Sequence, residues 1–267
     1  MYIIQMMERG TELIVDNMWL KSHLDDHDLV VIDGRGPVAY SYGHIKNALP
    51  LGLDDVIRIS ENGANLAIEG EAAENLFGKL GIDESKKVVV YGEHFDPSAA
   101  RIAWTLLYNS HNNTRVLETA FSFIRRDRTL PIVRNLPKPI VTNFKSRPND
   151  CLRADEMMVK EKLNDNGTVI IDSRTPLEHS QARIPGSLLH NWENGIGDDG
   201  KMIKSSEDLL SEFNVSGIAQ NKEIICYCHS GTRASHKYLQ FKHAGFNNVR
   251  CYDGSIIDWA QRRNPIR

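Results

Sequence analysis

The sequence predicts an α/β protein of two tandem domains, each built on a mostly parallel sheet flanked by helices. Three observations support this fold class. Short apolar segments typical of buried strands alternate with amphipathic segments typical of helices. The first half of the chain is repeated in the second half, and a proline-rich stretch separates the copies. With 267 residues, the chain is long enough for two domains of ordinary size.

The internal repeat consists of three pairs of matching segments that follow the same order in both halves. Their offset is roughly 135 to 140 residues, as expected after duplication with small insertions. The pairs are 31–35 with 170–174, 80–91 with 216–227, and 112–118 with 247–253. Four prolines lie between the copies, at Pro131, Pro137, Pro139 and Pro148. We therefore expect a first domain over 1–130, a linker over 131–150 and a second domain over 151–267.

The expected strands and helices alternate along both copies. Strands are predicted over 29–33, 88–91 and 114–117 in the first copy, and over 169–172, 223–227 and 249–252 in the second. Helices are predicted over 11–24, 71–80, 99–107, 154–163, 206–213 and 234–244. Ligands of open parallel sheets bind at the carboxyl ends of the strands. Cys228 follows strand 223–227 directly and is expected at that edge.

Composition and charge limit the possible functions. A hydrophobic content of 41% and a charged content of 25% are typical of a soluble globular protein. The net charge of −3 gives no electrostatic reason to expect nucleic acid or a membrane as partner, and no apolar run is long enough to span a bilayer. The opening residues lack the features of a signal peptide. Four cysteines in a chain of this length do not form a disulfide framework, so a reducing compartment, the cytoplasm, is expected.

Residues 228–233, Cys-His-Ser-Gly-Thr-Arg, carry the strongest chemical signal in the chain. They join the strand 223–227 to the helix 234–244, so loop amides and a helix N-terminus converge on Cys228. This positive field, together with Arg233, favours the reactive thiolate. The same amides could hold either S⁻ or S–S⁻ without a metal, and Gly231 gives the loop its backbone freedom. Cys228 is therefore the predicted nucleophile.

For other polar residues near this loop, the sequence allows two alternative roles each. His229 could orient a substrate of Cys228, or it could face solvent. Arg174 could face the pocket, or it could form a contact with Asp172 that supports the loop; Arg183 has the same ambiguity. Asp253 could be a base or a turn residue, and its position near the end of a strand favours the turn residue.

The remaining cysteines and one tryptophan read as packing residues. Cys226 and Cys251 lie on predicted strands and are expected in the core, and Trp259 is expected to pack. A metal or redox pair of Cys226 and Cys228 is disfavoured, because the chain offers no second pair of ligands. Cys151 is assigned no role.

Four motifs, in order, resemble those of the tandem-domain rhodanese family, the thiosulfate and 3-mercaptopyruvate sulfurtransferases. They are Asp-Ser-Arg at 172–174, Ala-Arg-Ile-Pro-Gly-Ser at 182–187, the Cys228 loop, and Tyr-Asp-Gly-Ser at 252–255 followed by Trp259. The resemblance extends from about Thr11 to Trp259. The chain departs from the family at Ala182 and Arg183, where Gly-His is usual, and at Ile256, where tryptophan often follows.

The resemblance implies two rhodanese-like domains and a double-displacement reaction. The Cys228 thiolate would attack the outer sulfur of thiosulfate, form a persulfide and release sulfite, and a thiol or cyanide would then accept the sulfur. The expected substrate-binding residues are His229, Ser230, Gly231, Thr232, Arg233 and Arg174, with Asp172 in support. No cofactor or metal is implied.

The first copy lacks this apparatus and is expected to be catalytically inactive. Its loop begins Tyr91-Gly92-Glu93, no cysteine precedes Cys151, and the acids Glu93 and Asp96 would repel an anionic donor. This domain would instead close one wall of the substrate cleft.

Three alternative functions remain for the Cys228 loop. The mercaptopyruvate enzymes of the family carry arginine near Glu178 and glycine where this chain has His229, so both residues favour thiosulfate. A persulfide carrier acting with a protein acceptor would use the same residues. A phosphatase is disfavoured, because only four residues separate Cys228 from Arg233 and the cysteine phosphatases have five.

Overall fold

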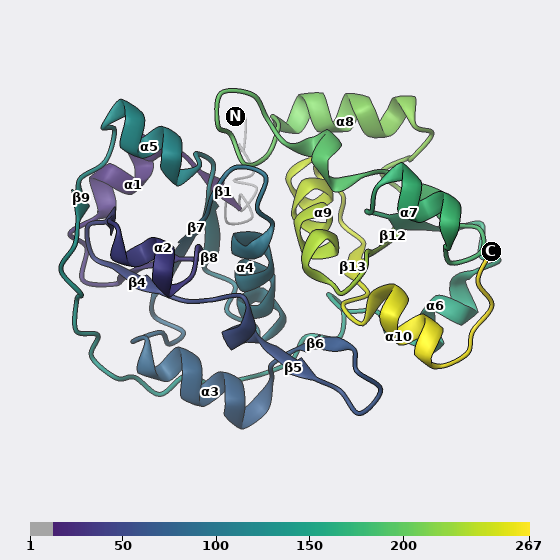
Figure 1. The fold of residues 1–267 in the computed structure, drawn as a ribbon, viewed down its shortest axis with the longest axis horizontal. Coiled ribbons are helices and arrows are strands. Elements are labelled where there is room, and N and C mark those ends of the chain that lie inside the picture. Colours follow the sequence, from purple (N-terminus) through teal and green to yellow (C-terminus); the bar gives the residue numbers. More distant parts are fainter. Residues whose placement is uncertain (1–12) are drawn as a thin grey trace, which may run out of the picture.

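The structure, a computed structural model, describes residues 13–267 and contains two α/β domains side by side (Figure 1). The first domain has a five-stranded parallel sheet and the second a four-stranded parallel sheet. The predicted fold class is confirmed. In the described part of the chain, no helix is long and apolar enough to cross a membrane.

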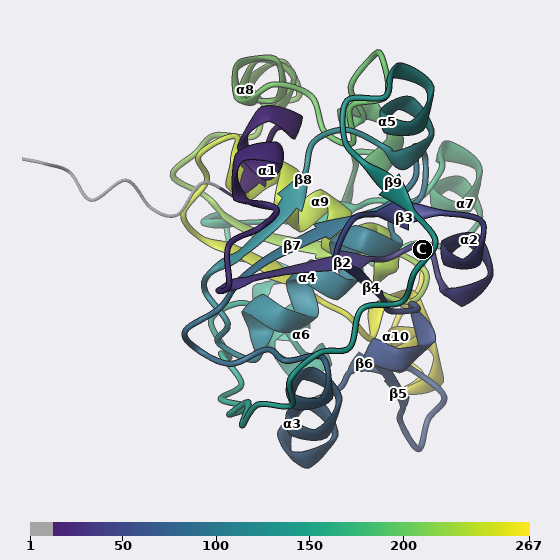
Figure 2. The same ribbon diagram turned by 90° about the vertical axis from the view of Figure 1, so that its left-hand side faces the viewer.

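The first-domain sheet has helices on both faces (Figure 2). Its strands, in spatial order, are β1 (Ile14–Val15), β8 (Thr114–Leu117), β7 (Lys87–Tyr91), β2 (Leu29–Asp33) and β4 (Ala48–Pro50). Successive residues of a strand point to opposite faces, so Val31 packs with α1 (Asn17–His23) and α5 (Phe121–Asp127). Ile32 packs on the other face, which α3 (Gly70–Lys79) and α4 (Ser98–Tyr108) cover.

The first domain also contains shorter elements. They are α2 (Pro37–Ser41), η1 (Asp54–Val56), and the antiparallel pairs β3 (His44–Ile45) with β9 (Ile132–Val133) and β5 (Ile57–Ile59) with β6 (Asn65–Ala67).

The second domain repeats this plan. Its strands, in spatial order, are β11 (Leu188–Leu189), β10 (Thr168–Asp172), β12 (Glu223–Tyr227) and β13 (Val249–Cys251). One face packs against α6 (Glu156–Lys162) and α10 (Ser255–Gln261), and the other against α8 (Ser206–Val215) and α9 (Thr232–His243). Two short helices, α7 (Pro176–Gln181) and η2 (Trp192–Gly195), follow β10 and β11.

The predicted helix over 11–24 is wrong in its first part. Within the described residues, Ile14 and Val15 form β1 and pair with Val116 and Leu117 of β8. Both are buried and β-branched, which suits a strand. Asp16 then caps α1, its side chain accepting a hydrogen bond from the Trp19 amide at 2.6 Å, so the helix begins at Asn17. Residues 11 and 12 lie outside the described range.

The two domains share one apolar core. Helices α4 and α9 lie next to each other between the two sheets (Figure 1). The buried cluster around them includes Trp104 of the first domain and Tyr238 of the second. Two backbone hydrogen bonds also cross the interface, from the Met202 amide to the Glu118 carbonyl and from the Ala120 amide to the Gly200 carbonyl. The position of one domain therefore depends on the other.

The stretch expected as a linker, 131–150, runs along the first domain. Its β9 pairs with β3, and the Thr142 amide donates to the Gly78 carbonyl at 3.0 Å. Phe144 is buried, with its ring centroid 5.1 Å from that of Phe77. The domain boundaries near 130 and 151 stay predictions.

A buried cluster of polar side chains connects α9 to η2 and the residues before it through hydrogen bonds. The Lys237 amine is fully buried and donates to His190 Nδ1 at 3.0 Å, to the Asn191 carbonyl at 3.1 Å and to Gln240 Oε1. Burial lowers the pKa of Lys237 to about 7 and that of His190 to about 3. His190 is therefore neutral at pH 7 and can accept the bond from the lysine.

We expect Lys237 to make the free energy of unfolding rise with pH. The unfolded chain keeps the proton of this amine up to a pKa of 10.5, whereas the folded chain releases it near pH 7, so the unfolded state binds more protons between these values. Urea unfolding of the wild type across this window should show the rise, and Lys237→Met should show a shallower one. Equal pH slopes for the two proteins would contradict this assignment.

Candidate active site

Cys228 lies where β12 passes into α9. β12 is flanked by β10 and β13, and its residues Ile224 to Tyr227 are buried. The loop 228–231 then turns the chain into α9, which begins at Thr232. Cys228 itself is only 1% exposed. The carboxyl edge of the sheet therefore holds a thiol at a helix N-terminus, as the sequence predicts.

Two groups approach the Cys228 sulfur. The Gly231 amide donates a hydrogen bond to Sγ at 3.1 Å, and the Ser255 hydroxyl lies 3.9 Å from it. Ser255 Oγ also accepts a hydrogen bond from the Cys228 amide at 3.0 Å. An N–H donor aimed at sulfur stabilises an anion there more than a neutral thiol. This arrangement suits a thiolate or a persulfide.

Gly231 is required by the shape of the loop. Its φ of +92° lies in the left-handed region, where residues with a side chain are strained. A Cβ atom at this position would come within 2.5 Å of the Asp253 carbonyl oxygen and 2.6 Å of Arg101 Nη1. Only glycine can make this turn and keep its amide on the sulfur.

The start of α10 holds the other side of the loop. The Ile256 amide donates to the Cys228 carbonyl at 3.2 Å, and the Ile257 amide donates to the His229 carbonyl at 3.3 Å. The sequence analysis uses the motif at 252–255 only for the family resemblance and does not predict the contact between Ser255 and Cys228. This motif is the sequence feature from which the contact could have been predicted, but it lies 27 residues from Cys228 along the chain.

Arg233 is paired with a carboxylate. Its Nη1 and Nη2 donate to Glu178 of α7 at 2.8 and 2.7 Å, a two-pronged contact. This arginine lowers the pKa of Glu178 to about 2, and the carboxylate, with a contribution from Cys228, raises the pKa of Arg233. The sequence predicts Arg233 as a substrate-binding residue; in the structure Glu178 accepts a hydrogen bond from each of its Nη atoms.

Arg174 forms the supporting contact that was one of its two readings. Its guanidinium donates to Asp172 at 2.9 and 2.7 Å and to the Ala182 carbonyl at 2.5 Å. Asp172 also accepts from the Tyr227 hydroxyl at 2.8 Å and lies 2.9 Å from His179 Nδ1. These bonds tie the end of β10 to the last residue of β12, directly before Cys228.

The first domain contains the same supporting contact. Arg35 donates to Asp33 at 2.9 and 2.5 Å, and the Tyr91 hydroxyl donates to Asp33 at 2.5 Å. The motif is therefore present in both copies, with and without a cysteine, which favours a role in folding.

The other predicted site residues differ in how far they are exposed to solvent and in their contacts. His229 is exposed, Ser230 and Thr232 are half-buried, and Arg183 donates to the His179 carbonyl at 3.3 Å. Among residues 13–267, no group of three or more His, Cys, Asp or Glu is arranged to hold a metal.

Cys226 and Cys251 are buried, as expected, and Cys151 is exposed. Burial raises the pKa of Cys226 and of Cys251. Both thiols therefore stay neutral and unreactive at pH 7.

Asp253 joins the two domains directly behind the loop, a role that its reading as a turn residue missed. It is buried and accepts from the Ala67 amide at 2.8 Å, from Arg153 Nε at 2.9 Å and from Arg101 Nη2 at 3.5 Å. Arg101 and Ala67 belong to the first domain. Sequence reasoning also missed Arg101, because an arginine within an otherwise apolar helix carries no motif.

The equivalent loop of the first domain uses its acids for local bonds. Glu93 accepts from the Ser122 hydroxyl, and Asp96 accepts from the Ser98 amide at 2.9 Å at the start of α4. His94 Nε2 lies 3.2 Å from the Gly197 carbonyl of the second domain. The loop helps to join the domains and contains no thiol.

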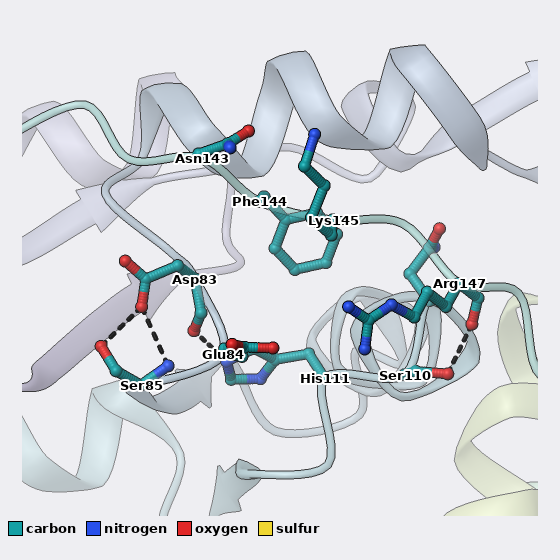
Figure 3. Close-up of a pocket in the computed structure, with 10 residues that line it drawn as sticks. Asp83, Glu84, Ser85, Ser110, His111, Asn143, Phe144, Lys145 and Arg147 are labelled. Atoms are coloured by element: carbon teal, nitrogen blue, oxygen red, sulfur yellow. Dashed lines mark hydrogen bonds between the residues drawn. The ribbon is translucent and has the colours of Figure 1, made fainter.

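A separate pocket of about 390 Å³ lies in the first domain beside the stretch 143–147 (Figure 3). The figure shows several of its polar groups bonded to neighbours: Asp83 accepts from Ser85, and the Ser110 hydroxyl donates to the Arg147 carbonyl. Cys228 does not line it. This pocket is distinct from the thiol site.

The fold and the cysteine loop define a class of protein with known members. Residues 16–125 and 157–262 match the family model described as a rhodanese-like domain. These segments make up most of the chain, which therefore belongs to the rhodanese family. It is a tandem rhodanese-domain sulfurtransferase, with the sulfur donor and acceptor substrates that this family implies.

Several relatives match over nearly their whole length. A thiosulfate sulfurtransferase of Corynebacterium glutamicum is 28% identical over 96% of this chain and 90% of its own. Sulfur carrier protein TtuD of Thermus thermophilus is 26% identical over 93% of both chains. SseA of Escherichia coli, described among 3-mercaptopyruvate sulfotransferases, superposes with a TM-score of 0.82 at 25% identity and covers 92% of this chain and 99% of its own.

Replacing Gly231 by alanine should abolish most activity, because the loop must shift to remove the clash and the amide then leaves the sulfur. We expect kcat/KM to fall about 100-fold or more, the effect of misplacing a reacting group by about 1 Å. Gly217→Ala is the matched control: Gly217 has a φ of +75°, but no atom lies within 4 Å of the added Cβ. The control should lower the melting temperature by only a few degrees and keep near wild-type activity. Similar kcat/KM losses in the two variants would show that the loop tolerates the shift.

Proposed function

We propose that this protein transfers a sulfane sulfur from thiosulfate to a thiol or cyanide acceptor through a persulfide on Cys228. The observation that carries the proposal is the Gly231 amide directed at Sγ at 3.1 Å, at the N-terminus of a buried helix. The family membership supports the reaction class, and the thiosulfate sulfurtransferases among the relatives support the donor. The cytoplasm is the proposed compartment, since four free cysteines suit reducing conditions.

The reaction proceeds in two displacements. The Cys228 thiolate attacks the outer sulfur of thiosulfate; a bond forms between Sγ and that sulfur, the S–S bond of thiosulfate breaks, and its electron pair leaves with sulfite. An acceptor thiolate or cyanide then attacks the outer sulfur of the persulfide, and the Cys228 thiolate departs. The Gly231 amide stabilises the anionic cysteine before and after each transfer.

Thiosulfate should add one sulfur to the protein, at Cys228. Mass spectrometry should show a gain of about 32 mass units, mapped to the peptide that contains this residue. Cys228→Ser should show neither the mass gain nor turnover, whereas Cys151→Ser, which removes the exposed thiol, should retain both. Persulfide found mainly at Cys151, or activity in Cys228→Ser, would exclude the assignment.

The pairing of Arg233 with Glu178 bears on the choice of donor. Arg233 lies in the first turn of α9, directly after the Cys228 loop, so its charge can attract a dianion to the thiol. Glu178 neutralises part of this charge and occupies both Nη atoms. A compact dianion depends on the remaining charge near the sulfur more than on a distant clamp for a carboxylate. We therefore propose thiosulfate as donor, with mercaptopyruvate as the alternative.

Arg233→Ala should lower kcat/KM for thiosulfate about tenfold or more, which corresponds to roughly 1.4 kcal/mol of lost transition-state binding. Arg233→Lys should restore only part, because a point charge lacks the planar fork. Glu178→Gln should lower the thiosulfate KM, since the charge of Arg233 is then unopposed. The assay uses a small thiol acceptor without a protein partner, with mercaptopyruvate measured in parallel.

Three outcomes of this assay would contradict the proposal. Unchanged thiosulfate kinetics in Arg233→Ala would place donor recognition elsewhere. A wild type far faster with mercaptopyruvate would favour the alternative donor. Persulfide formation without turnover, until a protein acceptor is added, would favour a carrier, the role named for the Thermus thermophilus relative.

A further inference from the structure

One buried arginine of the first domain has two hydrogen-bond donors without a hydrogen-bond partner in the described residues, although its guanidinium lies over the ring of Trp104, 5.1 Å from the centroid. Arg101 lies on α4 and is 0% exposed. Its Nη2 reaches the Asn65 carbonyl at 3.3 Å and Asp253 at 3.5 Å. Its Nε and Nη1 are buried and form no hydrogen bond within residues 13–267. A buried cation with two unsatisfied donors is costly, so a compensating feature is expected nearby.

The guanidinium of Arg101 lies against the turn that holds the catalytic sulfur. Its Nη1 is 2.6 Å from the point that a Cβ on Gly231 would occupy, and the amide of the same glycine donates to Cys228 Sγ at 3.1 Å. Both contacts involve Gly231, because its amide nitrogen and the position of the absent Cβ are attached to the same Cα atom. Arg101 Nη1 is therefore no more than about 9 Å from Sγ, and both residues are buried.

The positive charge around Arg101 is not fully neutralised by its carboxylate partner. Asp253 is the carboxylate paired with Arg101, but it also accepts from Arg153 at 2.9 Å and from the Ala67 amide at 2.8 Å. The N-terminus of α9, beside Gly231, carries partial positive charge of its own. Because Asp253 is shared with Arg153, it offsets only part of the positive charge of Arg101 and of the helix N-terminus. An anionic sulfur on Cys228 would offset more of it.

We propose that Arg101 is a positioning residue for Cys228: it braces the Gly231 turn from the first domain and adds positive charge that favours the anionic sulfur. This inference rests on the proposed function, because it concerns the same thiol. It gives the cysteine-free domain a direct part in the chemistry of the second domain, in addition to the cleft wall that the sequence predicts. Arg101 contacts neither donor nor acceptor in this account.

The test is a pH titration of the Cys228 thiolate by its ultraviolet absorbance, with the same protein carrying Cys228→Ser as the blank. It requires neither donor nor acceptor, so it can fail independently of the proposed function. Apart from Arg153 in the control, the variants leave the other charged or titratable groups near the loop and near Arg101 unsubstituted: Arg233, Glu178, Asp253, Cys226 and Cys251.

Arg101→Gln should raise the titration midpoint by roughly one pH unit, the effect of removing a buried charge at this distance. Its kcat/KM for thiosulfate at neutral pH should fall about tenfold. Arg101→Lys keeps the charge, so its midpoint should stay within a few tenths of a unit of the wild type. Arg153→Gln is the matched control, because Arg153 bonds to the same Asp253 but donates to Tyr108 rather than contacting the Gly231 turn.

A lower melting temperature in Arg101→Gln with an unchanged midpoint would reduce Arg101 to a packing residue and overturn the proposal. An equal rise in Arg153→Gln would overturn it as well, since the effect would then belong to Asp253. If Arg101→Gln does not fold, Arg101→Met replaces it as the neutral variant: a raised midpoint supports the role of the charge, and a midpoint equal to that of the wild type contradicts it.

Discussion

The hydrogen bond from the Gly231 amide to the Cys228 sulfur is the contact on which the rest of the site depends. It exists because β12 ends at Tyr227 and α9 begins four residues after Cys228, with a left-handed glycine between them. The turn is tight enough that no side chain fits at Gly231. An amide fixed in this way can stabilise negative charge on sulfur without reorganising, which is what a sulfur transfer needs.

Neighbouring elements hold this turn from several sides. The amides of α10 bind the loop carbonyls, and the Asp172–Arg174 contact secures the end of the adjacent strand. Glu178 of α7 binds the first turn of α9 through Arg233. Behind the loop, Asp253 joins the second domain to the first. Because the two domains share one apolar core, a change in their packing is expected to reach the cysteine loop.

Sequence reasoning located the elements whose signal is local. The buried strands at 29–33 and 223–227 were predicted at their observed bounds, because apolar runs of this length mark buried parallel strands. Cys228 was placed correctly for the same reason: its environment is fixed by the strand before it and the helix after it. The segment 11–24 was misassigned, because two strand residues precede a short capped helix within one amphipathic pattern.

Contacts between distant parts of the chain were beyond the reach of the sequence. Ser255 is 27 residues from Cys228, and Arg101 is 152 residues from Asp253. The partner of Arg233 is another example, because Glu178 reads equally well as a helix-capping residue, a role that it also fills. Arginines carry little positional information in sequence, since their partners are set by tertiary packing.

The most direct test of the central claim is the release of sulfite when enzyme and thiosulfate are mixed without any acceptor. If Cys228 takes the sulfur in a separate first displacement, the protein should release about one sulfite per chain in a burst and then stop. Adding cyanide or a thiol should restart the reaction. If no sulfite is released until the acceptor is present, the sulfur passes directly from donor to acceptor, and a persulfide on Cys228 is not an intermediate.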